Sequence, residues 1–225
     1  MTEVTSVSEI KSFEVSSGNL RVTDPCYKMD VWCAGTLDKV PNGMWHSRVG
    51  FWKDEAEVKQ RIDWLREHHE KMLGLYTTES TIAYENESFA RELERIESHP
   101  GRVIHLRIAF DAADLEKPLN LSTMINSDID VGVDSGQAGF FDLNAYAELF
   151  TYMIDGEPAH DDFYDRVCEA TNPFGVCTFG VASLTGYGDG GYDCYTRRDD
   201  EGNLLEAVIV FIGDEEDDDD EEEDE

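Results

Sequence analysis

The sequence predicts an α+β fold, in which an antiparallel, twisted β-sheet or partly closed β-barrel carries an inserted helical pair and two short helices. Three observations lead to this prediction. Short segments alternate apolar and polar residues, as half-buried strands do, and turn residues separate them. Between residues 54 and 99 the apolar residues change to helical spacing. Several segments are rich in glycine, which tolerates the positive φ angles of tight turns.

The composition is that of a folded domain with one very acidic end. The chain has 225 residues, of which 40% are hydrophobic and 11% aromatic, enough for a sizeable core. We expect residues 1–11 to be a flexible N-terminus and residues 12–213 to form a single β-rich domain with a helical insertion at 54–99. Residues 214–225 are all acidic, so we expect a disordered tail kept extended by charge repulsion.

The N-terminal part of the chain predicts two pairs of strands. Residues 12–15 and 20–22 alternate around a Ser-Gly-Asn turn, which predicts a β-hairpin that ends at Pro25. Residues 37–40 and 44–52 are joined by Pro-Asn-Gly, a strong turn signal. One face of the longer strand is expected to be buried, and it consists of Trp45, Ser47, Val49 and Phe51.

The helical insertion has recognisable ends. Asp54 is a suitable N-cap, and Glu55 and Glu57 follow it where the helix dipole favours negative charge. Gly74 ends the first helix, and a second helix is expected over residues 85–98, before a proline. We therefore expect a helical pair laid across the β body.

The C-terminal half returns to strands with two short helices between them. Residues 102–110 alternate, and their expected buried face consists of Ile104, Leu106, Ile108 and Phe110. Asp142 is the expected N-cap of the first short helix. In order, we expect a polar loop at 111–128, a buried strand at 129–133, helices at 143–153 and 161–170, strands at 176–184, 191–196 and 204–212, and a hairpin turn at 199–203.

Three segments of turns and strand ends carry the candidate site, and two of them are rich in glycine. We expect residues 24–27, 131–142 and 186–195 to meet on one face. The candidate ligand-binding residues are Asp24, Cys26, Tyr27, Asp134, Ser135, Gln137, Asp142, Asp189, Tyr192 and Asp193. Clustered carboxylates suit Ca²⁺, Mg²⁺ or an acid–base pair, but Asp in such turns ordinarily bonds to local backbone amides. We therefore assign no metal and no cofactor. The aromatic residues either line a groove or pack in the core, and they are Phe140, Phe141, Tyr187, Tyr192 and Tyr195.

No recognisable catalytic set accompanies these motifs. The five cysteines have no paired spacing, which fits reduced thiols. Cys26 and Cys194 lie in the motifs, but no sequence signal places a histidine beside either thiol. Ser135 is not in the Gly-x-Ser-x-Gly pattern of hydrolases, and residues 186–191 lack the Lys-Ser/Thr of a phosphate-binding loop.

The charge of the chain restricts its partners. The net charge is −32, from 50 acidic and 18 basic residues, so the chain repels nucleic acid and anionic membranes and attracts basic proteins. No stretch of about 18 apolar residues predicts a membrane span, and the N-terminus lacks a secretion-signal pattern, so we expect a cytoplasmic protein. The acidic tail either raises solubility or docks on a basic groove as a mimic of nucleic acid.

The order of four segments resembles an uncharacterised family of bacterial and phage proteins. These segments are an Asp-Pro start at 18–25, a Pro-Asn-Gly turn at 41–45, a Val-Asp-Ser-Gly segment at 133–142, and Gly-Tyr-Gly-Asp-Gly-Gly-Tyr at 186–195. The similarity covers most of residues 18–212, whereas 54–99 and the tail resemble additions. The resemblance implies one β-rich domain of bacterial or phage origin, in the host cytoplasm if phage-encoded, and it implies no chemistry.

Three functional hypotheses follow. The leading hypothesis is a non-enzymatic, acidic binding protein that acts by protein–protein contact, including phage–host interaction or inhibition of a basic or nucleic-acid-binding partner. The second is an enzyme or small-ligand sensor, whose site would consist of Asp24, Cys26, Asp134, Gln137, Asp189 and Tyr192. The third is a virion or assembly component.

Overall fold

The computed structural model describes residues 3–98, 101–151, 153–154, 157–160, 163 and 173–213. Helices and antiparallel sheets together form an α+β fold, as the sequence predicts. Within the described ranges the sheets are open and do not close into a barrel. The chain divides into two compact units, which we call the β unit (Met1–Phe51 with Arg102–Glu225) and the helical hairpin (Trp52–Gly101).

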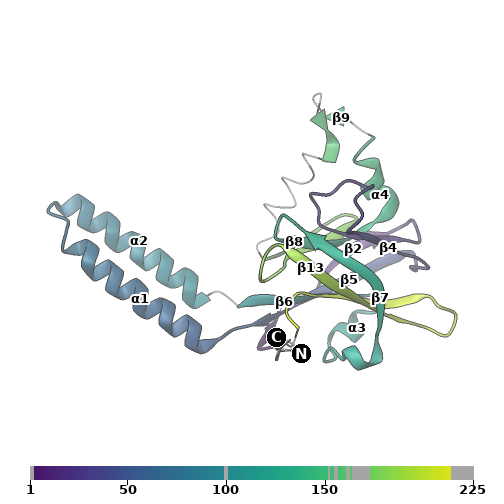
Figure 1. Ribbon diagram of the computed structural model, residues 1–225, viewed down its shortest axis with the longest axis horizontal. Coiled ribbons are helices and arrows are strands. Elements are labelled where there is room, and N and C mark those ends of the chain that lie inside the picture. Colours follow the sequence, from purple (N-terminus) through teal and green to yellow (C-terminus); the bar gives the residue numbers. More distant parts are fainter. Residues whose placement is uncertain are drawn as a thin grey trace, which may run out of the picture. The chain divides into compact units, whose positions relative to one another are not determined.

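The larger sheet of the β unit has seven strands, six of them in the order β1-β5-β6-β14-β13-β7, and β2 pairs with β5 beside them (Figure 1). Their bounds are β1 Ser6–Val7, β2 Lys11–Val15, β5 Gly43–Trp52, β6 Arg102–Ala109, β7 Ile125–Val133, β13 Gly190–Arg198 and β14 Leu204–Val210. Within residues 1–11, which the sequence predicts to be flexible, Ser6 and Val7 pair with Phe51 and Gly50. Backbone hydrogen bonding therefore holds part of this N-terminal segment.

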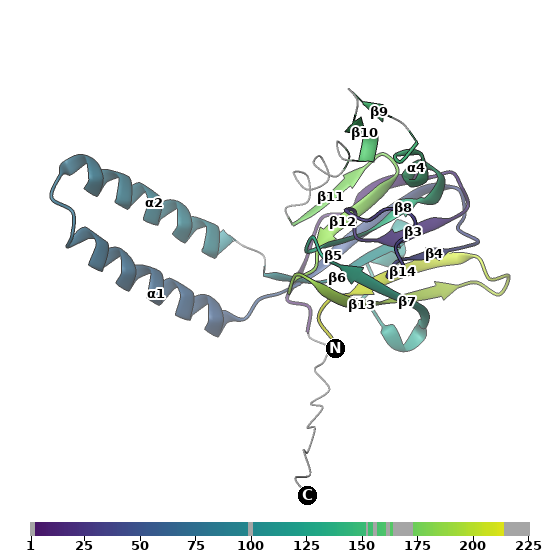
Figure 2. The same cartoon turned by 45° about the horizontal axis from the view of Figure 1, so that its top comes forward.

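A second sheet has five strands in the order β11-β12-β8-β3-β4 (Figure 2). Its strands are β3 Leu20–Thr23, β4 Gly35–Leu37, β8 Gln137–Asp142, β11 Phe174–Cys177 and β12 Gly180–Leu184. A short separate pair consists of β9 Met153–Ile154 and β10 Glu157–Pro158. The described strand pairs of both main sheets are antiparallel, so the predicted sheet type is confirmed.

The predicted hairpin of residues 12–15 and 20–22 is wrong, because β2 belongs to the larger sheet and β3 to the smaller one. The chain crosses between sheets at Ser16 and Ser17, whose backbone N–H groups donate to the Asp142 carboxylate at 2.7 and 2.8 Å. In the same way β4 and β5 lie in different sheets, although a turn joins them. Alternation identified the strands but contained no information on their partners.

Burial also differs between strands. The predicted face of β5 is confirmed, since Trp45, Ser47, Val49 and Phe51 are all buried. In β6, however, the opposite face is buried as well, and Phe110 beyond its end is 39% exposed. Arg107 of that face is satisfied by an ion pair with Glu206 and by the carbonyls of Lys117 and Asp114. A polar face can therefore be covered when its charges find partners.

Several element boundaries differ from the predictions. Residues 111–128 hold α3 (Ala112–Leu115), a 3₁₀ turn (Leu121–Thr123) and the start of β7, where a loop was expected. Residues 176–184 form the hairpin β11–β12 and not one strand. Helix α4 (Leu143–Glu148) has the predicted Asp142 cap but ends five residues early. The predicted helix at 161–170 lies almost wholly outside the described residues, and the acidic tail lies outside them entirely.

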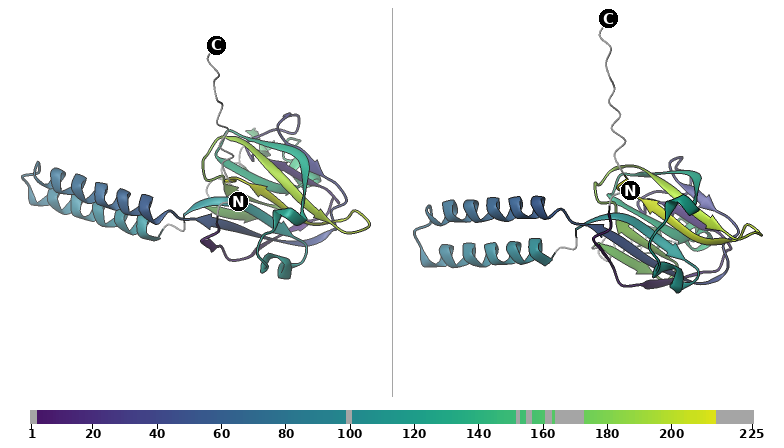
Figure 3. Two further views of the ribbon diagram at one scale, coloured as in Figure 1. Left: turned by 60° about the horizontal axis from the view of Figure 1, so that its bottom comes forward. Right: turned by 90° about the horizontal axis from the view of Figure 1, so that it is seen from below.

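The helical hairpin consists of α1 (Glu55–Leu73) and α2 (Glu79–Ser98), which run side by side in Figure 3. Asp54 is confirmed as the N-cap of α1, because its side chain accepts hydrogen bonds from Ala56 N and Glu57 N. Gly74 is confirmed as the residue where α1 ends. Helix α2 begins six residues before the predicted start. Its first residues, Glu79, Ser80 and Thr81, are polar, and Ile82 is the first apolar residue at helical spacing with Phe89.

Candidate functional site

Two of the three segments, 24–27 and 131–142, meet at the carboxylate of Asp24. Its Oδ2 accepts hydrogen bonds from Asp134 N at 2.9 Å and Ser135 N at 2.8 Å. Its Oδ1 accepts from Ser135 Oγ at 2.7 Å and Cys26 N at 2.8 Å. Asp24 therefore closes its own turn and clamps a turn 110 residues further along the chain.

The third segment joins the second one directly. Thr185 N donates to Gly136 O at 3.1 Å, and Thr185 Oγ1 donates to Gly188 O at 2.6 Å. Strand β13 continues the contact, because Gly190 pairs with Val133 of β7. The structure therefore brings the three segments together in space, as the sequence analysis expects.

The carboxylates of the three segments are divided between buried and exposed positions. Asp24 and Asp142 are almost fully buried. Burial opposes ionisation of Asp142, but hydrogen bonds from the backbone of Ala145, Ser16 and Ser17 outweigh it and lower the pKa of this carboxyl. Both carboxylates are thus engaged by the chain itself, the role that Asp ordinarily has in turns.

The thiols of the motifs are poor nucleophiles. Burial, followed by the hydrogen bond and negative charge of Asp24, raises the pKa of Cys26 to about 12. Burial likewise raises the pKa of Cys194 to about 12. Because the thiolate is the reactive form, both residues stay protonated and unreactive near neutral pH.

Several other candidate residues also face inward. Gln137 and Tyr192 are buried, and the Tyr192 hydroxyl donates to Gly188 O at 2.7 Å. Ser135 Oγ donates to Asp24, so it is a turn hydroxyl. Phe140 and Phe141 are core residues, so with Tyr192 they do not line a groove. Of the six residues in the enzyme hypothesis, Asp24, Gln137 and Tyr192 are enclosed by the fold.

The exposed part of the site is acidic and aromatic. Three carboxylates are exposed: Asp134, Asp189 and Asp193. Tyr187, in the third segment, is 56% exposed. Tyr27 is half-buried; burial and then a hydrogen bond with Asp134 raise its pKa. Asp193 accepts from Tyr195 OH at 3.2 Å and Asn126 Nδ2 at 3.3 Å.

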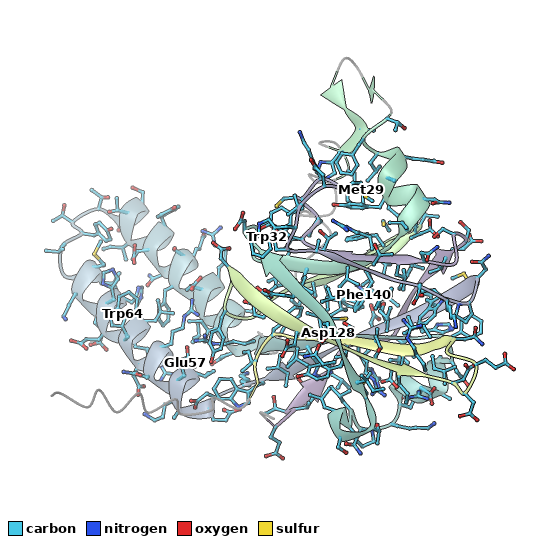
Figure 4. The ribbon with its side chains drawn as sticks, turned by 45° about the vertical axis from the view of Figure 1, so that its right-hand side comes forward. Met29, Trp32, Glu57, Trp64, Asp128 and Phe140 are labelled. Carbon is cyan, nitrogen blue, oxygen red and sulfur yellow. The ribbon has the colours of Figure 1, made fainter. Side chains whose placement is uncertain are left out.

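Sequence reasoning missed Trp32, which is 86% exposed on the loop between β3 and β4 (Figure 4). Its neighbour Cys33 accepts a hydrogen bond through its carbonyl from Gly132 N at 2.8 Å, so the loop lies against the second segment, 131–142. A single aromatic residue in a loop has no periodicity by which its exposure could be predicted. We call Trp32, Asp134, Tyr187 and Asp189 the acidic–aromatic rim.

Two further findings limit the chemistry of the described residues. Among them, no group of three or more His, Cys, Asp or Glu side chains is placed to hold a metal ion. Of their helices, none combines the length and apolar character that crossing a membrane requires. Comparison of the chain with protein-family models, curated proteins and solved structures finds no match.

Proposed function

We propose that this chain is a non-enzymatic binding protein that acts by protein–protein contact, and that the acidic–aromatic rim binds a basic segment of its partner. One observation supports this proposal above all. Where the three segments meet, the enclosed carboxylates are occupied by backbone donors, whereas the exposed ones, Asp134 and Asp189, stand beside segments that expose Trp32 and Tyr187.

Exposed carboxylates beside aromatic rings suit Lys and Arg side chains. A guanidinium or ammonium group gains Coulomb attraction from the carboxylates and cation–π attraction from the ring faces, and tryptophan is the strongest ring for this contact. The protein already contains one such pair, since the Arg102 guanidinium lies 5.1 Å from the centroid of the Tyr187 ring. The rim is therefore chemically suited to a basic peptide.

The charge of the whole chain supports the same partner class. A net charge of −32 accelerates encounter with a basic protein, including one that binds nucleic acid, and repels nucleic acid itself. The charge alone does not select a site, because acidic residues are spread over the chain. The aromatic residues of the rim are the reason for placing the proposed binding site there.

The test is calorimetric titration of the full chain with an oligo-arginine peptide at about 0.1 M and about 0.5 M salt. We expect Asp134→Asn/Asp189→Asn and, separately, Trp32→Ala to weaken binding by roughly five-fold or more, because each removes about 1 kcal/mol or more of contact. The matched control is Asp200→Asn/Glu201→Gln, which removes two exposed charges from the β13–β14 turn. Equal losses in the rim and control variants would show non-specific attraction to a polyanion and overturn the proposal. Pull-down from a cell lysate at both salt concentrations would then identify the natural partner.

A further inference from the structure

The two helices of the hairpin meet along a seven-residue pattern. Inward-facing positions alternate three and four residues apart, the spacing of a coiled-coil seam. In α1 they are Val58, Ile62, Leu65, His69 and Met72, and in α2 they are Ile82, Glu85, Phe89, Glu92 and Ile96. Among the described side chains of the hairpin, Ile96 alone is buried, so this seam is poorly covered.

One side of the seam opens into a groove of about 510 Å³. Leu65 and Phe89 lie in it, His68 belongs to its α1 side, and Ser88 and Arg91 belong to its α2 side. The imidazole of His69 stacks on the ring of Phe89 at 4.2 Å and its Nδ1 atom is buried without a hydrogen-bond partner in the described structure. A short side chain at Ser88 leaves the hollow unfilled.

Two large aromatic side chains lie on this same side. Trp64 precedes His68 by four residues and stacks on it with ring centroids 5.1 Å apart, and Tyr84 precedes Ser88 by four residues. Trp64 is 61% exposed and Tyr84 is 66% exposed. Figure 4 shows Trp64 and Glu57 on α1. We call Trp64, Leu65, His68, Tyr84, Ser88 and Phe89 the groove face.

We propose that the groove face binds the groove face of a second copy, so that two hairpins form a four-helix bundle and the chain is a homodimer. Trp64 and Tyr84 expose roughly 200–300 Å² per copy, so the four rings of a symmetric pair would bury roughly 400–600 Å², against about 1,600 Å² in a standard interface. The proposal therefore requires the groove walls and the flanking residues to bury the remaining area. An isolated two-helix hairpin is also well below the roughly 70–80 residues at which a core ordinarily sustains a fold.

Charge favours a second copy over an acidic or a basic partner. Two copies of a chain with net charge −32 repel each other across most surfaces. The groove, in contrast, contains both signs, because Glu85 and Glu92 lie beside Arg91. A two-fold interface requires a patch that is complementary to itself, and a patch with both signs meets that requirement.

The experiment is light scattering on the full chain after size exclusion, across micromolar concentrations. The monomer mass is 25.4 kDa, and we expect twice this mass at the upper concentrations. Trp64→Glu/Tyr84→Glu should give a monomer with unchanged helical circular dichroism, because both side chains are exposed in a single copy. The matched control, Ala83→Glu/Ala90→Glu, adds the same charge on the opposite side of α2 and should remain a dimer.

Either of two results would overturn the proposal: a monomeric wild-type chain throughout the range, or a dimer that Trp64→Glu/Tyr84→Glu leaves intact. If the glutamate variant loses helicity, Trp64→Ala/Tyr84→Ala replaces it and must weaken dimerisation at least ten-fold. A dimer lost equally in the control would also count against the groove face. The acidic–aromatic rim belongs to the β unit, so the peptide titration and the mass measurement can fail independently.

Discussion

At the scale of single residues, two buried carboxylates determine how distant segments meet. Asp24 binds the turn at Asp134 and Ser135, and Asp142 binds Ser16 and Ser17 while capping α4. Their chemistry was visible in the sequence, but their burial was not, because it depends on which remote amides reach them. The positions of the motifs could be predicted from the sequence. Which of their carboxylates are buried and which are exposed could not.

Replacing Asp24 with asparagine tests the clamp. One carboxylate oxygen becomes an NH₂ donor, so two of the four donors that face Asp24 lose their acceptor in a fully buried place. We expect a loss of roughly 2–4 kcal/mol in the free energy of unfolding and a Tm lower by roughly 5–15 °C, measured by calorimetry. Asp189→Asn, at an exposed position, should leave Tm unchanged. An unchanged Tm in Asp24→Asn would contradict the clamp.

His105 predicts a pH dependence of stability. Burial, with a further contribution from the charge of Arg107, lowers its pKa to about 4 in the folded protein, against about 6.5 in an unfolded chain. Between these values only the unfolded chain takes up the proton, so stability falls as pH decreases from about 6.5 to about 4, by roughly 2–3 kcal/mol. Urea unfolding at several pH values should show a flatter dependence for His105→Gln than for wild type. A slope in His105→Gln identical to that of wild type would refute the assignment.

At the scale of elements, the sequence identified strands and helices better than it identified their neighbours. Alternation in residues 12–15 and 20–22 correctly indicated strands, yet β2 and β3 lie in different sheets. An alternating pattern indicates which side of a strand is buried, but it does not indicate which strand pairs with it. The ends of α1 were predictable because Asp54 and Gly74 act locally, whereas α2 begins with three polar residues before its first apolar seam position, Ile82.

Removing the helical hairpin tests whether the β unit depends on it. No residue of α1 is buried, and a Cβ atom built on Gly101 would lie 2.2 Å from the Trp52 carbonyl, so the two ends of the insertion are adjacent. Replacing residues 54–99 with a short Gly-Ser linker should therefore leave Tm within a few degrees and remove self-association. Calorimetry and light scattering on the shortened chain measure both. Loss of cooperative unfolding would contradict the independence of the β unit.

At the scale of the whole molecule, charge and composition predicted more about partners to exclude than about partners to expect. The α+β class could be predicted from the local spacing of apolar residues along the chain. That prediction stays correct even where the strand partners are predicted wrongly. The rim did not follow from it, since Trp32 becomes prominent only when its loop packs against Gly132. The family resemblance and the functional hypotheses remain predictions. The titration and mass measurements above test the proposed peptide binding and self-association.

The 110-residue separation between Asp24 and its amide partners has a consequence for biosynthesis. When β3 leaves the ribosome, its partner strand β8 has not yet been translated. More than a hundred further residues must follow before the two strands can pair. Until then the nascent chain can complete only its more local contacts, such as those within α1 and α2. The smaller sheet therefore assembles late in translation, and sheets that depend on such non-local strand pairs fold slowly.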